Sequence, residues 1–127
     1  MMFLVDTNVF LEILLEQNKK DICKSFLDSN IKNGLNITDF SLHSIGVILF
    51  KYHKQEIYSK FLGDILVNIN LISLPLDRYN EIITAKNYLN LDFDDLYQYT
   101  VAKYYQLKIV TMDKGFEKIK ELEIEFL

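Results

Sequence analysis

Near its start the chain reads Met2-Phe3-Leu4-Val5-Asp6-Thr7-Asn8-Val9, and this segment indicates the fold class. A short apolar run that stops abruptly at a carboxylate is typical of a buried strand that ends at the edge of a sheet. A strongly apolar, helix-like pattern over residues 8–16 follows at once. Because parallel strands need crossover connections, which helices usually supply, a strand followed directly by a helix indicates a βαβ unit.

The rest of the chain repeats this alternation of short apolar runs and longer helix-like segments. We expect strands at residues 3–5, 35–38, 71–74, 107–111 and 123–126. We expect helices at residues 8–16, 20–32, 76–89, 92–106 and 114–118, with two more that carry residues 45–52 and 58–66. The sequence therefore predicts a single α/β domain over residues 1–127, with a mostly parallel sheet of four or five strands.

The composition restricts the partners and the compartment. The 14 basic and 18 acidic residues give a net charge of −4, which disfavours a passive, basic nucleic-acid binder. Cys23 is the only cysteine, so no intramolecular disulfide can form, and we expect a reduced, cytoplasmic protein. No apolar run is long enough for a membrane helix and the N-terminus lacks the features of a signal peptide, so we expect no membrane partner.

Three aspartates are expected to meet at one edge of the sheet. Asp6 and Asp113 follow strands, and Asp95 begins a helix whose start shares the same rim. Carboxylates that crowd together must be protonated, paired with cations or bound to a metal. Oxygen ligands suit hard cations such as Mg²⁺ and Mn²⁺, and such a site favours metal-assisted hydrolysis of phosphodiesters.

Three motifs, in order along the chain, resemble those of PIN-domain ribonucleases. The first is the apolar opening strand that runs into Asp6-Thr7-Asn8. The last is Thr111-Met112-Asp113-Lys114-Gly115-Phe116, which is similar to a Thr-x-Asp-x-x-Phe signature after a late strand. Between them, Asp94-Asp95-Leu96 resembles the start of a helix that bears the third acidic position. The resemblance covers essentially the whole chain and implies a three-layer α/β/α fold.

The resemblance implies a metal-dependent endoribonuclease, similar to the VapC-like toxins of toxin–antitoxin pairs, that hydrolyses RNA. It assigns three catalytic residues, which are also the expected ligands of Mg²⁺ or Mn²⁺: Asp6, Asp95 and Asp113. Asn8 would orient the Asp6 side of the site, and Thr111 would help to hold a carboxylate. Asp94 competes with Asp95 for the third acidic position. The resemblance also implies a homodimer and inhibition by a small antitoxin protein.

One position departs from the family pattern. The segment Thr38-Asp39-Phe40-Ser41-Leu42-His43-Ser44 places Ser44 where the family usually carries a glutamate. A serine cannot replace a carboxylate ligand directly, although its hydroxyl can line the site. The alternative function is therefore a PIN-like domain with an altered acidic site that binds a partner or regulates, with little catalysis.

Other interpretations of these residues stay open. Each aspartate could simply cap a helix or complement the positive end of a helix dipole. A phospho-acceptor domain of the response-regulator type also uses Asp at strand ends, but Asp6 lacks the adjacent acidic partner that such a domain expects. His43 and His53 have no His or Cys partner at metal-ligand spacing, so we expect each to be a surface or a hydrogen-bonded histidine.

Overall fold

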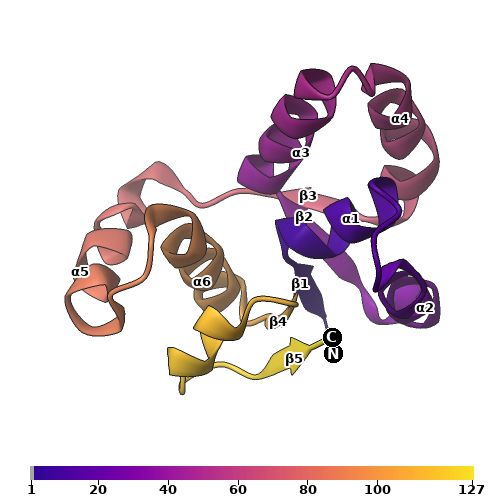
Figure 1. The fold of residues 1–127 in the computed structure, drawn as a ribbon. Coiled ribbons are helices and arrows are strands. Elements are labelled where there is room, and N and C mark those ends of the chain that lie inside the picture. Colours follow the sequence, from indigo (N-terminus) through magenta and orange to yellow (C-terminus); the bar gives the residue numbers. More distant parts are fainter. Residues whose placement is uncertain (1) are drawn as a thin grey trace.

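A computed structural model describes residues 2–127, and its fold is drawn in Figure 1. Over these residues the strands form one five-stranded, all-parallel sheet in the order β3-β2-β1-β4-β5. The strands are β1 (Phe3–Val5), β2 (Leu35–Thr38), β3 (Asn70–Ile72), β4 (Lys108–Thr111) and β5 (Ile124–Phe126). The predicted α/β class and parallel sheet are confirmed.

Helices cover both faces of the sheet. They are α1 (Thr7–Leu14), α2 (Lys20–Asn30), α3 (Asp39–Lys51), α4 (Gln55–Lys60), α5 (Asn80–Leu89) and α6 (Phe93–Tyr105). Figure 1 shows α5 and α6 on one side of the strands and α1 to α4 on the other. This arrangement is the expected three-layer architecture. Over residues 2–127, no helix is both long and apolar enough to cross a membrane.

Two hydrophobic cores fill the spaces between the layers. Alternate residues of a strand point to opposite faces, so Leu4 joins the core under α5 and α6, while Phe3 and Val5 join the core under α1 to α4. Strand β4 divides in the same way, with Ile109 on the first side and Val110 on the second. Burial on both faces explains why these strands read as continuous apolar runs.

Several element boundaries differ from the predictions. The third strand was expected at residues 71–74, but β3 ends at Ile72, which is the partner of Thr38, the last residue of β2. The backbone N–H of Leu74 donates instead to the Tyr97 hydroxyl at 3.1 Å. The helix expected at 76–89 opens with a 3₁₀ turn over Leu76–Arg78 before α5 begins at Asn80. The segment after α4 also departs from α-helix, with a π turn over Phe61–Ile65.

The parallel register brings the strand ends to one edge. Val5 pairs with Val110, and the Asp6 N–H extends the ladder by donating to the Val110 carbonyl at 2.9 Å. Asp6 therefore lies level with the end of β4. Helix α1 begins at Thr7, directly after β1, and α3 begins at Asp39, directly after β2. The free N–H groups of these helix starts thus lie at the same edge as the strand ends.

Candidate functional site

A cavity of about 280 Å³ opens at the carboxyl edge of the sheet. Its lining comes from the residue after β1, from α1, α3 and α6, and from the segment after β4: Asp6, Thr7, Asn8, Leu11, Phe40, Ser44, Ile48, Asp94, Asp95, Gln98 and Asp113. Six of the seven residues singled out from the sequence line it, and the seventh, Thr111, is buried beneath it. Four of the lining residues carry a carboxylate.

Asp6 is held in a fixed orientation by three hydrogen-bond donors. Its side chain is 6% exposed. Oδ1 accepts from the Thr7 N–H at 2.9 Å, which caps α1, and from Gln98 Nε2 at 3.3 Å. Oδ2 accepts from the Thr111 hydroxyl at 2.7 Å. Asp6 is therefore a helix cap and a lining residue of the cavity at once, so the capping and site interpretations do not exclude each other.

Thr111 connects Asp6 to Asp113. The Thr111 hydroxyl donates to Asp6 and accepts from the Asp113 N–H at 2.9 Å. Asp113 Oδ1 accepts in turn from the Gly115 N–H at 2.8 Å, which caps the short 3₁₀ turn over Lys114–Lys118. Thr111 thus contacts one acidic residue through its side chain and the backbone of the other. The segment after β4 therefore fixes two of the carboxylates relative to each other.

Asp95 lies in the first turn of α6 and is half-buried. Burial, followed by the negative charges of Asp113 and Asp6, raises the pKa of the Asp95 carboxyl to about 6. Asp94 is more exposed and lines the same cavity. The neighbouring charges show that these carboxylates act on one another although they come from segments that are far apart in the sequence.

Burial also raises the pKa of Asp6. Hydrogen bonds from Thr111, Gln98 and Thr7 oppose this rise because they stabilise the ionised form, and the charge of Asp113 adds to it. Both buried carboxylates are therefore harder to ionise than in water. A cation in the cavity would relieve the repulsion and favour the charged forms.

Asn8 and Ser44 both line the cavity. Asn8 Oδ1 accepts from the Met112 N–H at 3.4 Å, so its amide contacts the segment after β4 and not the Asp6 carboxylate. Ser44 is half-buried and lines the cavity, as its alignment with the missing glutamate suggests. A serine one turn earlier, Ser41, is fully buried and belongs to the hydrogen-bond network around Asp6.

Sequence reasoning missed three residues of this network. Gln98 donates to both Asp6 and Ser41, and Ser41 Oγ lies 2.7 Å from Thr7 Oγ1. The signal available in the sequence was Gln98 itself, an amide one turn after Asp95 in a stretch of mostly apolar and aromatic residues. Ser41 and Thr7 gave no signal, because small hydroxyl residues are common near helix starts.

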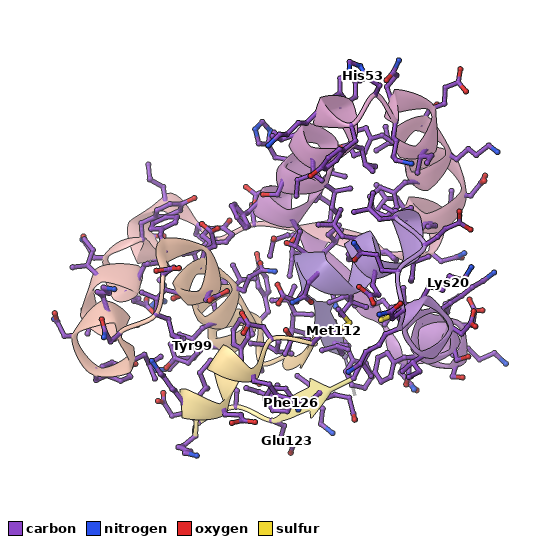
Figure 2. The ribbon with its side chains drawn as sticks, viewed as in Figure 1. Lys20, His53, Tyr99, Met112, Glu123 and Phe126 are labelled. Atoms are coloured by element: carbon purple, nitrogen blue, oxygen red, sulfur yellow. The ribbon has the colours of Figure 1, made fainter. Side chains whose placement is uncertain are left out.

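The donor chemistry of the cavity fits a hard divalent cation. Its charged groups are all carboxylates, which Mg²⁺ and Mn²⁺ prefer over nitrogen or sulfur ligands. Among residues 2–127, no group of three His, Cys, Asp or Glu side chains is already close enough to enclose a metal ion. Both histidines are exposed and neither lines the cavity. Figure 2 shows His53 at the outer tip of the α3–α4 hairpin.

Comparisons with known proteins place this geometry in context. Residues 3–122 match the family model described as PIN domain. A search of the curated proteins found no match to the sequence.

Several solved structures share the fold at low sequence identity. The VapBC2 structure from Rickettsia felis, bound to a DNA fragment from its promoter, has a TM-score of 0.82 and 21% identity, covering 100% of this chain and 99% of that chain. A toxin–antitoxin complex from Klebsiella pneumoniae has a TM-score of 0.74 and 20% identity, with coverages of 94% and 93%. FitAcB from Neisseria gonorrhoeae has a TM-score of 0.74 and 20% identity, with coverages of 98% and 96%.

Proposed function

Because the chain belongs to the PIN domain family, we propose that it is a metal-dependent endoribonuclease resembling the toxin of a toxin–antitoxin pair. One observation carries the proposal. Asp6, Asp95 and Asp113 come from three separate segments and line one cavity at the carboxyl edge of the sheet. Ligands of open α/β sheets bind at this edge, and the crowded carboxylates there call for a cation.

In the proposed site, Asp6, Asp95 and Asp113 hold Mg²⁺ or Mn²⁺. A divalent cation in such a site supplies Lewis-acid activation of water and neutralises charge on the phosphodiester. Thr111 holds the Asp6 carboxylate and, through the Asp113 N–H, the segment that carries Asp113. Asp94 is exposed and lines the same cavity.

The proposal includes protein partners. The Klebsiella structure is a toxin–antitoxin complex, and the likeness of this chain to it supports the pairing of this chain with a small antitoxin protein. A homodimer is proposed as well. Large apolar side chains stay exposed on the surface, and Tyr104 and Tyr105 at the end of α6 are 41% and 39% exposed. Exposed apolar surface of this kind favours protein association.

Cleavage of a mixed RNA pool tests the activity. The parent should cleave in Mn²⁺ and stop when the metal is removed by a chelator. The cleavage rate should fall more than about 100-fold in each of three single variants: Asp6→Asn, Asp95→Asn and Asp113→Asn. Loss of a residue that hydrogen-bonds a metal ligand typically costs about 10–100-fold in activity, and loss of the ligand itself should cost more. Asp77→Asn, an exposed aspartate outside the cavity, is the matched control. Cleavage by all three site variants at the rate of the parent would contradict the proposal.

A second candidate function rests on Ser44. This residue lines the cavity where the family usually carries a glutamate, so the cavity has one carboxylate fewer. The chain would then be a binding or regulatory module with little catalysis. Mn²⁺ binding and RNA binding without cleavage would favour this candidate. Gain of cleavage in Ser44→Glu would then identify the missing carboxylate as the cause.

A further inference from the structure

Gln98 is a buried amide in the middle of α6 and is only 1% exposed. Both the nitrogen and the oxygen of its amide make hydrogen bonds. Nε2 donates to Ser41 Oγ at 2.9 Å and to Asp6 Oδ1 at 3.3 Å, and Oε1 accepts from the Thr38 hydroxyl at 2.8 Å. One side chain therefore contacts the end of β1, the end of β2 and the first turn of α3.

Packing alone does not require an amide at this position. The adjacent residues of α6, Tyr97 and Tyr99, are buried as well, so Gln98 lies in a buried stretch of the helix. A buried amide is unfavourable unless its polar atoms are bonded, and here they are bonded to site residues. Over residues 2–127, no buried side-chain nitrogen or oxygen lacks a hydrogen-bond partner, so the network is complete.

The position of Gln98 on α6 relates its hydrogen bonds to the placement of Asp95. Gln98 lies three residues after Asp95, so the two side chains share one face of the helix, about one turn apart. The bond from Gln98 to Asp6 ties that face of α6 to the end of β1. It therefore limits how far Asp95 can move from Asp6.

We infer that Gln98 is a positioning residue that orients the Asp6 carboxylate and sets its spacing from Asp95. The inference rests on the proposed function, because it concerns the same cation site. Groups that hydrogen-bond a ligand from outside the metal shell fix the ligand's orientation, and their loss typically weakens metal binding about 10–100-fold. Gln98 would belong to this class through its contact with Asp6.

The test compares Gln98→Met with Thr100→Val in the full chain. Methionine keeps the length and apolar volume of Gln98 but cannot donate to Asp6. Thr100 is the matched control, because it is buried on the same helix and its hydroxyl donates only to the Leu96 carbonyl, at 2.7 Å. Calorimetric titration gives the Kd for Mn²⁺. Carbon-13 NMR of the metal-free protein reports the Asp6 carboxyl signal directly.

The inference predicts that Gln98→Met shifts the Asp6 carboxyl signal and raises the Kd for Mn²⁺ at least about tenfold. Thr100→Val should change neither. An unshifted Asp6 signal with parent-like Mn²⁺ affinity in Gln98→Met overturns the inference. If that variant does not fold, Gln98→Leu replaces it, because Leu also removes the amide donor and brings no charge beside Asp6.

The two readouts separate this inference from the proposed function. A parent that binds no Mn²⁺ contradicts the proposed cation site, and the Asp6 signal alone then decides whether Gln98 orients that carboxylate. A parent that binds Mn²⁺ but cleaves no RNA leaves both readouts valid.

Discussion

At the scale of single residues, Asp6 shows why a conservative substitution can separate fold from chemistry. Its carboxylate caps α1 through the Thr7 N–H and also lines the cavity. Asn is as good an N-cap as Asp, so Asp6→Asn keeps the cap while removing the charge. We expect the free energy of unfolding of this variant, measured by urea denaturation, to lie within about 1 kcal/mol of the parent's. The variant should lose Mn²⁺ binding. Loss of the fold would mean that the charge of Asp6 is a structural requirement.

Asp95 offers a prediction on pH. Its folded pKa of about 6 exceeds its usual value of 3.8, so the folded state holds this proton more tightly than the unfolded state. The charged form therefore destabilises the metal-free protein, and the penalty is absent below pH 4 and grows as the pH rises through 6. Asp95→Asn should increase the free energy of unfolding by about 1–2 kcal/mol at pH 8, after allowance for solvent screening.

The measurement is urea denaturation of the metal-free parent and Asp95→Asn at pH 8 and pH 4. The two proteins should differ at pH 8 and agree at pH 4. Asp77→Asn, on the exposed surface, controls for a general effect of net charge. A difference of the same size at both values of pH would show that burial of the charge is not its origin.

At the scale of elements, the ends of α5 and α6 are alike. Asn90 follows α5 with a φ of 50°, and Gln106 follows α6 with a φ of 58°. Both lie in the left-handed region, which glycine occupies without steric cost and asparagine more easily than glutamine. Gln106 is exposed and therefore bears this conformational cost without compensating burial.

Gln106→Gly should therefore stabilise the protein by about 0.5–1 kcal/mol, because Gly suits the residue after a helix that ends in a left-handed turn. Thermal unfolding measures the gain, and Mn²⁺ affinity should stay unchanged since residue 106 is at the far end of α6 from Asp95. Gln106→Ala, which keeps a Cβ, is the control and should give no gain. A lower melting temperature for the Gly variant would contradict this account.

The elements also show what sequence patterns can and cannot predict. The strands β1 and β2 were predicted at their observed bounds. β1 is an apolar run that ends at Asp6, and β2 is a short segment between Gly34 and the start of a helix at Asp39. Strand β3 was displaced because its extent depends on β2 as its partner, which a local pattern cannot reveal. The aspartates were found through their places after strands and at a helix start. Gln98 was missed, because its partners on β1 and β2 exist only once α6 has packed.

At the scale of the whole molecule, the candidate site combines residues that follow two strands of the sheet with a residue from a helix that covers one of its faces. Asp6 and Asp113 follow central strands, and Asp95 is carried by a helix on one face. A cation held by all three would bind the folded chain and not the unfolded one. At a concentration 100 times its Kd, Mn²⁺ should thus raise the free energy of unfolding by about 2.7 kcal/mol.

This stabilisation should disappear in Asp113→Asn, which retains a side-chain oxygen to accept from the Gly115 N–H. Calcium at the same concentration tests selectivity, because Ca²⁺ takes more oxygen ligands than Mg²⁺, and the proposed site supplies only three carboxylates. Thermal unfolding with and without each metal makes the comparison. Equal stabilisation of parent and Asp113→Asn would place the binding elsewhere on the surface.

The central claim is that Asp6, Asp95 and Asp113 bind one divalent cation, and anomalous diffraction from a crystal soaked in Mn²⁺ tests it most directly. The account predicts a single strong peak in the cavity, with carboxylate oxygens of all three residues at about 2.0–2.2 Å. An empty cavity in a crystal saturated with Mn²⁺, or a peak that none of the three carboxylates touches, would contradict it.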